Sequence, residues 1–488
     1  MRDDAEGAAL GSRAASGVAW LTAQSWAAKI GGFVTLVILA RILGPDDFGI
    51  VAVAMTVVSL VSLVADLGFG TFLMQVSALT PRLASTAFWY SLGSGIVLAV
   101  LLVATAPLVE AIFGIAGVTE VMVGISPAVL FMSVAAVPIA LLRRSLRFRV
   151  LAMQSVAAAL VAQAVAITLA LTGFGVWALV AQVVIAQALT MAASWVTARW
   201  RPSLQFSARD FVTMLRFGSS VVSINLIAAA RVWAENALIS NVLGAAALGR
   251  MSVAQRLVQT TQEAAGAAIA PVSTVVFAQV RDDPGRLRRG YDRALSLAYL
   301  VITPALTVIL VTAPVLVPFL FGAQWTPAAG IASALAAAAI FTLTATLDHG
   351  LFLGAGRPGR WLAYATVIDV LTLATTAVLV GYGVLAVALG FVAVAAVATG
   401  IRSVLVARLL GAPLWSVLRR TCAALSSMAI SAACGWLVLL ALSAWEPVAA
   451  LVIVGVVVVA VHLGVSRLVL PGALRDLTVE VRTRIRRG

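Results

Sequence analysis

The sequence predicts an all-α polytopic membrane protein with 14 transmembrane helices. We expect two parallel six-helix lobes around a central cavity, followed by two C-terminal helices. Three observations lead to this fold class: the composition, the spacing of long apolar segments and an internal repeat. Of the 488 residues, 62% are hydrophobic and 11% are charged, and the mean hydropathy is +1.08. Water-soluble domains carry about a quarter charged residues, so a soluble domain of ordinary size is excluded.

Apolar segments bounded by charges, proline or glycine define the predicted helices. A helix needs about 20 mostly apolar residues to cross the hydrocarbon core of a bilayer. The first run is too long for the apolar part of a signal peptide, so we interpret it as a retained span. The 14 predicted spans are 17–42, 49–75, 85–108, 119–142, 150–171, 176–198, 217–243, 247–279, 294–319, 327–353, 360–380, 384–408, 417–443 and 447–470.

The basic residues predict the orientation of these spans. Arginine and lysine are enriched in short cytoplasmic loops. With the N-terminus in the cytoplasm, most of the 33 basic residues fall on that side, and both termini are cytoplasmic. The use of Ala, Val, Gly and Arg with a single lysine is typical of a GC-rich bacterium, so the plasma membrane is the expected location. The cytoplasmic basic groups are the loop 143–149, the linker 199–216, the segments 281–293 and 356–360, Arg402, Arg408, Arg419, Arg420 and the tail.

A net charge of +14 could also indicate a nucleic-acid partner. Topology already explains the arginines, and some of them could contact anionic lipid headgroups. We therefore expect membrane lipids as partners and no nucleic acid.

An internal repeat predicts the two lobes. The segment ILARILGPDDFG from Ile38 resembles LISNVLGAAALG from Leu238, and GFGVWA from Gly173 resembles GYGVLA from Gly381. A weaker match relates RSLRFRVLA from Arg144 to RPGRWLAYA further on. The matching segments fall at the same topological places, so the repeats run parallel, as in transporters whose lobes rock for alternating access. The predicted parts are a cytoplasmic segment 1–15, an N-lobe 16–198, a linker 199–216, a C-lobe 217–410, spans 13 and 14 within 411–470, and a basic cytoplasmic tail 471–488.

Some basic residues lie inside predicted spans. A charge at membrane depth costs several kcal/mol unless it faces water or a partner, so each is a functional candidate. Arg41 could instead extend to the interface, as could Arg250, and Arg231 could pair with Glu235 four residues later. No acid lies within one helical turn of Lys29 or Arg256, which favours a functional role for both. The predicted anion-binding cavity residues are Lys29, Arg41, Arg231 and Arg256.

Acidic residues inside the spans are candidates for coupling transport to H⁺ or Na⁺. Helix capping or pairing with polar neighbours explains them equally well. These residues are Asp66, Glu235, Glu263, Asp348 and Asp369.

No enzyme signature and no phosphate-binding Walker loop occur in the sequence. Only two histidines and two cysteines are present, and both cysteines lie in one apolar segment. We therefore expect no metal site, no other cofactor and no enzymatic activity.

The sequence resembles the Wzx-type polysaccharide flippases of the MOP exporter superfamily. The resemblance lies in the first repeat segment with ADLG at Ala65, LRRSLRFRVLA and GFGVWALVAQ, and further on in LRFGSSV, GAAALGRMSVAQRL, PVSTVVFAQVRDD, GYDRAL and FGAQWTPA. It implies transfer of undecaprenyl-pyrophosphate-linked oligosaccharide repeat units from the inner to the outer leaflet, for lipopolysaccharide or exopolysaccharide synthesis. A polymerase and glycosyltransferases would be functional partners.

For this family the cations Lys29, Arg231 and Arg256 would hold the pyrophosphate. Two alternatives within the superfamily are a peptidoglycan lipid-precursor flippase and an ion-coupled multidrug exporter. A membrane scaffold without transport is the alternative from another class.

Overall fold

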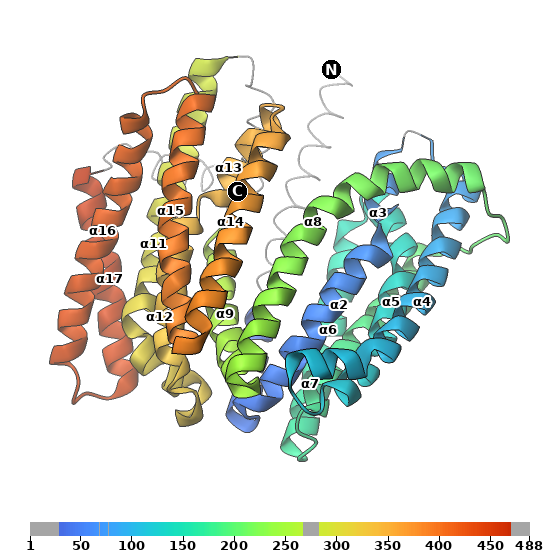
Figure 1. Cartoon of the computed structure of the whole chain (residues 1–488), viewed down its shortest axis with the longest axis horizontal. Helices are drawn as coiled ribbons and strands as arrows, with labels where there is room; N and C mark the ends of the chain where they lie inside the picture. Colours follow the sequence, from blue (N-terminus) through green and yellow to red (C-terminus); the bar gives the residue numbers. More distant parts are fainter. Residues whose placement is uncertain (1–28, 68, 77, 267–282, 470–488) are drawn as a thin grey trace, which may run out of the picture. The chain divides into compact units, whose positions relative to one another are not determined.

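The three-dimensional structure of the protein is a computed structural model (Figure 1). It describes residues 29–67, 69–76, 78–266 and 283–469. Within these ranges all regular elements are helical, which confirms the all-α prediction. The chain forms two compact units, Met1–Gly249 and Arg250–Gly488.

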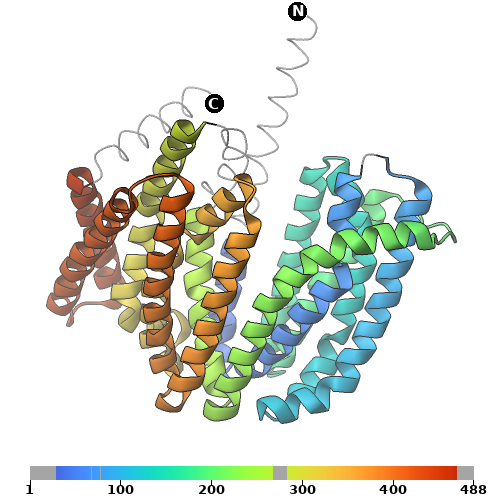
Figure 2. The same cartoon turned by 45° about the horizontal axis from the view of Figure 1, so that its top comes forward.

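The first unit is a bundle of long helices. Helix α4 packs against α5, α5 and α6 pack against α7, and α8 packs against α2, α3 and α4. Helix α8 curves along its length in both views (Figures 1 and 2). After a helix over residues 29–42, the elements are α2 (Pro45–Asp66), α3 (Phe69–Gln75), α4 (Pro81–Phe113), α5 (Val118–Arg144), α6 (Phe148–Leu171), α7 (Trp177–Ala198) and α8 (Ala208–Leu243).

In the second unit α11 is the central helix, since it contacts α12, α13, α16 and α17. The C-terminal hairpin α16–α17, red in Figure 2, packs on α11 through Val311, Val454 and Val458. The elements are α9 (Ala245–Gly266), which begins in the first unit, α11 (Pro284–Phe321), a 3-10 turn (Ala323–Trp325), α12 (Ala328–Thr342), α13 (Ala345–Gly354), α14 (Pro358–Leu379), a 3-10 turn (Val380–Tyr382), α15 (Val384–Leu409), α16 (Leu414–Ala441) and α17 (Pro447–Val469).

Among the described residues, 11 helices are long and apolar enough to cross a membrane. Predicted spans 17–42 and 247–279 each extend into residues outside the described ranges. Helix α8 covers predicted span 217–243 but is not one of these 11 helices. The many-span prediction is therefore confirmed, and the number 14 stays a prediction.

Two predicted spans are interrupted. Predicted span 49–75 is divided into α2 and α3 at Leu67, whose φ of 41° is left-handed. Predicted span 327–353 is divided into α12 and α13 around Thr344. Such breaks are tolerated at membrane depth where the freed backbone groups find partners inside the protein.

Two segments expected to be loops begin helices instead. Asp283 caps α11, because its Oδ1 accepts the backbone N–H of Arg286 at 2.9 Å. This bond holds the pKa of the Asp283 carboxyl below its usual range. Pro284 then occupies the first turn, where its missing N–H costs nothing. Ser207 caps α8 in the same way, with Oγ accepting the N–H of Asp210 at 3.3 Å. Polar caps therefore start α8 and α11 before their apolar segments.

The start of the predicted linker is packed rather than free. Ser203 contacts α4 through three groups. Its N–H donates to the Ser85 hydroxyl at 2.9 Å, its own hydroxyl lies 2.9 Å from that hydroxyl, and its carbonyl accepts Trp89 Nε1 at 2.8 Å. The Ser207 N–H donates to Thr86 Oγ1 at 3.0 Å. Aromatic rings from α3, α4, α7 and α8 pack into one cluster beside this segment. The linker thereby fixes the beginning of α8 on the first unit.

The repeated segments meet each other through their glycines. We call residues 44–49 the first elbow and residues 244–249 the second elbow. A Cβ on Gly49 would lie 2.1 Å from the carbonyl oxygen of Ala245, and a Cβ on Gly249 would lie 1.9 Å from that of Pro45. The contact is reciprocal, because the last residue of each elbow touches the second residue of the other. Only glycine allows this approach of two backbones.

Candidate functional site

The four predicted cavity cations lie on three helices. Lys29 is half-buried and Arg41 is exposed, and both lie on the helix over residues 29–42. Arg231 lies on α8 and is partly buried, whereas Arg256 on α9 is exposed. Three of the four belong to the first unit and Arg256 to the second. Their convergence on one cavity stays a prediction.

The structure pairs Arg231 with Glu235, as one of the sequence interpretations allowed. Nη1 of Arg231 lies 2.5 Å from Oε1 of Glu235 one helical turn further on, and the two side chains are 25% and 9% exposed. The arginine neutralises a carboxylate that would be costly to bury alone. Glu235 is therefore a structural partner of Arg231 in this conformation.

Helix α8 is fixed to its neighbours by asparagines on the same stretch. Asn236 Nδ2 donates to Thr56 Oγ1 on α2 at 2.8 Å. Asn241 Nδ2 donates to the carbonyl of Ile112 near the end of α4 at 3.0 Å. Asn241 occupies the repeat position of Arg41, so this position anchors α8 in one repeat and carries an exposed charge in the other.

A buried ion pair links α13 and α15 in the second unit. Nε of Arg402 lies 2.7 Å from Oδ2 of Asp348, and the side chains are 2% and 3% exposed. Tyr291 on α11 donates its hydroxyl to Asp348 Oδ1 at 2.6 Å. Arg402 Nη2 also donates to the carbonyl of Phe341 at 2.9 Å and to Thr344 Oγ1 at 3.0 Å. Both charges are thus fully enclosed and hydrogen-bonded.

This pair corrects one part of the sequence interpretation. The sequence predicts that Arg402 belongs to the cytoplasmic arginines, with Arg408 close by at the end of a span. The structure buries it within α15, where it neutralises Asp348. The sequence did contain a signal for this burial. Arg402 lies about two helical turns inside its apolar segment, at a depth similar to that of Asp348 in another predicted span. We name Asp348, Arg402 and Tyr291 the buried triad.

The other acidic candidates are not members of this triad. Asp369 is half-buried on α14, and Glu263 is exposed near the end of α9. The backbone of Asp66 ends α2, and its side chain lies outside the described part. His349, next to Asp348, stacks on Trp361 with ring centroids 5.2 Å apart. No group of three or more His, Cys, Asp or Glu side chains that could hold a metal occurs among the described residues.

Multiple apolar spans, interrupted helices and enclosed charges define a polytopic membrane protein with polar groups at membrane depth. The family model described as polysaccharide biosynthesis protein matches residues 38–330, which is more than half of the chain. The chain belongs to the polysaccharide biosynthesis protein family, and the resemblance seen in the sequence is confirmed.

Three curated relatives align with about the same part of the chain. The succinoglycan biosynthesis transport protein ExoT of Rhizobium meliloti is 26% identical over 293 residues, 60% of this chain and 59% of the relative. The lipopolysaccharide biosynthesis protein WzxC of Escherichia coli is 23% identical over 300 residues, 60% of each chain. The teichuronic acid biosynthesis protein TuaB of Bacillus subtilis is 25% identical over 306 residues, 60% of this chain and 62% of the relative. The alignments thus span less than two thirds of each relative.

Solved structures share the fold. The lipid II flippase MurJ in an inward closed conformation superposes with a TM-score of 0.74, covering 94% of this chain and 99% of that one at 13% identity. An inward-facing multidrug resistance MATE transporter of the MOP superfamily gives a TM-score of 0.64, covering 79% and 94% at 17% identity. At these identities the likeness shows the fold alone.

Proposed function

We propose that the protein is a flippase that moves a polyprenyl-pyrophosphate-linked oligosaccharide from the inner to the outer leaflet of the bacterial plasma membrane. The observation that carries the proposal is the family match over residues 38–330. The three relatives are named for three different polysaccharides. The names share a role in polysaccharide biosynthesis, and that of ExoT adds transport. We therefore propose export of sugar for polysaccharide synthesis and leave the sugar open. Undecaprenyl is the expected carrier lipid.

The physical problem that such a protein solves has two parts. A pyrophosphate with its sugars cannot enter hydrocarbon, whereas a polyprenyl chain can remain in lipid. A hydrated basic cavity that opens sideways to the bilayer accommodates both parts. Two parallel lobes of six spans, with two additional C-terminal spans and both termini cytoplasmic, would expose this cavity to each side in turn.

Cations at membrane depth support an anionic substrate. Arg231 offsets Glu235, and Arg402 offsets Asp348. Arg256 is exposed on α9, and its guanidinium has no ion-pair partner among the described residues. We propose Arg256 and Lys29 as pyrophosphate ligands, with Arg41 and Arg231 contributing to the same cavity. These proposed ligands are positively charged and would repel a cationic drug, so a cationic-drug exporter is the weaker alternative.

Complementation of a deletion strain tests this function. We expect Lys29→Ala and Arg256→Ala each to reduce surface polysaccharide strongly at unchanged protein level, since each removes a ligand of the pyrophosphate. Arg256→Lys keeps the charge and should retain part of the activity. Arg360→Ala is the matched control, because Arg360 is exposed at the start of α14 and should export normally.

The leaflet distribution of lipid-linked sugar separates the remaining outcomes. In the deletion strain, lipid-linked sugar should accumulate where a membrane-impermeant probe cannot reach it from outside. An unchanged distribution would contradict the flippase function. Normal export by both alanine variants would remove only the assigned role of the cations.

A further inference from the structure

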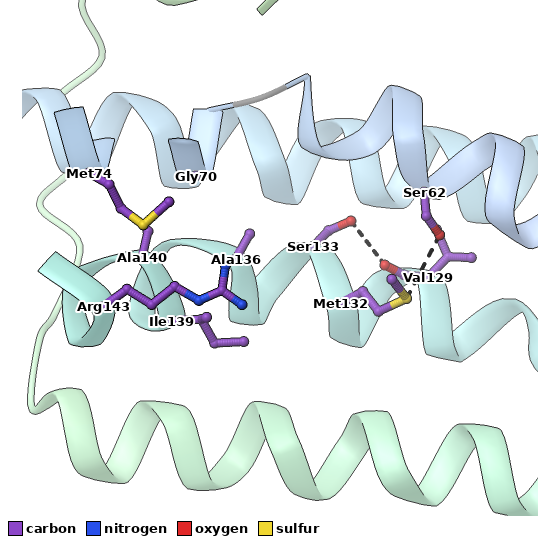
Figure 3. Close-up of a pocket in the computed structure, with 10 residues that line it drawn as sticks. All are labelled: Ser62, Gly70, Met74, Val129, Met132, Ser133, Ala136, Ile139, Ala140 and Arg143. Carbon is purple, nitrogen blue, oxygen red and sulfur yellow. Dashed lines mark hydrogen bonds between the residues drawn. The ribbon is translucent and has the colours of Figure 1, made fainter. Parts of the chain in front are cut away.

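The first unit contains a pocket that none of the predicted substrate cations lines. Its volume is about 300 Å³, and α2, α3 and α5 form its walls (Figure 3). This volume is at the lower end of the range for small-molecule sites, about 300–1,000 Å³. The lining residues are Ser62, Gly70, Met74, Val129, Met132, Ser133, Ala136, Ile139, Ala140 and Arg143.

Arg143 differs from the arginine next to it. Arg144 has a structural role, because its Nη1 donates to the carbonyls of Leu73 at 2.9 Å and Val76 at 2.6 Å, at the end of α3. The guanidinium of Arg143 has no hydrogen-bond or ion-pair partner among the residues that the structure describes. Figure 3 shows its side chain, which is exposed, lying along α5 beside Ile139 and Ala136 at the wall of the pocket. One charge is therefore available to a ligand.

The remaining wall is effectively apolar. The Ser133 hydroxyl donates to the Val129 carbonyl at 2.9 Å and the Ser62 hydroxyl to the Val58 carbonyl at 2.6 Å. The Ser62 hydroxyl also lies 3.8 Å from Met132 Sδ (Figure 3), so both hydroxyls have partners within the protein. The other side chains of the wall are aliphatic or methionine. Methionine adapts its shape to irregular apolar ligands. A hydrocarbon chain fits this wall without leaving polar groups unsatisfied.

The pocket has the polarity of a membrane lipid. Its lining follows α5 from Arg143 to Val129, a rise of about 21 Å at 1.5 Å per residue. One leaflet contributes about 15 Å of hydrocarbon. The charged end coincides with the basic loop predicted to be cytoplasmic, and the apolar end points toward the middle of α5. A lipid of the inner leaflet has its phosphate and its chains in this order.

The charge of the site distinguishes between two lipids. One guanidinium matches the single negative charge of a phosphodiester, with which it can form two parallel hydrogen bonds. A lipid pyrophosphate carries at least two charges and would remain only partly neutralised here. We propose that this pocket binds an anionic phospholipid of the inner leaflet, with its phosphate on Arg143 and part of one acyl chain between α2, α3 and α5.

Native mass spectrometry of the full-length protein, purified in detergent, tests the proposal. Phosphatidylglycerol and phosphatidylcholine with identical chains are added separately, and the bound lipid is counted. We expect at least about a fivefold preference of the wild type for phosphatidylglycerol, the effect of one basic side chain near an anionic headgroup. Arg143→Gln should abolish this preference. Arg82→Gln is the matched control, because Arg82 is exposed at the start of α4 and outside the pocket.

A second variant tests the apolar part independently of the charge. Ala136→Phe fills the pocket and keeps Arg143, so it should reduce retention of phosphatidylglycerol. Size-exclusion chromatography and circular dichroism confirm that each variant is folded. Equal binding of both lipids by the wild type, or unchanged preference in Arg143→Gln, would overturn the proposal. Displacement of phosphatidylglycerol by polyprenyl pyrophosphate, with the same dependence on Arg143, would assign the pocket to the transported substrate and also overturn it.

Discussion

The charged side chains at membrane depth fall into two groups, one enclosed by the protein and one exposed. The buried triad encloses one arginine and one aspartate completely, and the pair Arg231–Glu235 is partly enclosed. Desolvating two charges costs about as much as their attraction returns, so a buried pair adds little net stability. Removing one partner is much more costly, because it leaves the other charge buried. The triad therefore holds α11, α13 and α15 in one specific arrangement.

The free energy of unfolding should show this coupling. We expect Asp348→Asn to lower it by about 3–5 kcal/mol, since Arg402 then keeps its charge without a carboxylate. The double variant Asp348→Asn with Arg402→Gln should recover most of that loss. Tyr291→Phe removes one charge-assisted hydrogen bond and should cost about 1.5–3 kcal/mol. Thermal unfolding in detergent, followed by tryptophan fluorescence, provides the comparison. Additive losses in the double variant would show that the two side chains are not coupled.

The same variants test the possible role of Asp348 in ion coupling. A double variant that is stable but does not export polysaccharide would support a transport role of the carboxylate. A stable double variant with normal export would assign the triad to structure alone. Coupling to H⁺ or Na⁺ would then rest on Asp66, Glu263 or Asp369.

At the scale of elements, the reciprocal contact of the two elbows explains why the sequence repeats this segment. Each elbow ends in a glycine that lies against the backbone of the other. The first elbow is shaped by Pro45 and by Asp47, whose Oδ2 accepts the Gly44 N–H at 3.1 Å. The second begins at Gly244, whose φ of 83° favours glycine. The two repeats thus use different local chemistry to reach the same backbone approach.

Alanine substitutions test the elbow contact directly. Gly49→Ala or Gly249→Ala places a methyl group against a carbonyl oxygen that cannot rotate away, so the backbones must separate. We expect each to cost about 1–3 kcal/mol, as for other overpacked sites. Gly44→Ala is the matched control, because its φ is −80° and the nearest atom to its Cβ would be 3.9 Å away. Thermal unfolding compares the stability of the two elbow variants with that of the control. Equal stability of all three would contradict a tight contact.

For the whole molecule, the arginine distribution predicts the orientation in the membrane, and a labelling experiment can test it. Helix α6 has 24 residues and is about 36 Å long, so the turns at its two ends should lie on opposite sides of the membrane. Ser145 and Thr172 are exposed in these turns. In a background with Cys422 and Cys434 replaced by alanine, an impermeant thiol reagent should label Thr172→Cys in intact cells. Ser145→Cys should react only after permeabilisation, and the reverse pattern would invert the predicted topology.

The sequence by itself determined the class, the family and most of the spans. Hydropathy, charge asymmetry and repeated motifs are local properties, and a bilayer converts them directly into spans and orientation. The pairing of Arg231 with Glu235 was also foreseeable, because four residues on a helix share one face. Helices α8 and α11 begin earlier than the sequence predicts, after the caps Ser207 and Asp283. The reason is that their polar first turns lie outside the apolar segments.

Only the tertiary structure decided which helix faces meet. Lipid chains are as apolar as leucine, so a transmembrane helix shows little contrast between its lipid-facing and its packed side. The sequence therefore could not bring Asp348, Arg402 and Tyr291 together from three helices, or place the elbows against each other. The pocket at Arg143 could not be predicted for the same reason, because its apolar wall is indistinguishable in sequence from a lipid-facing surface.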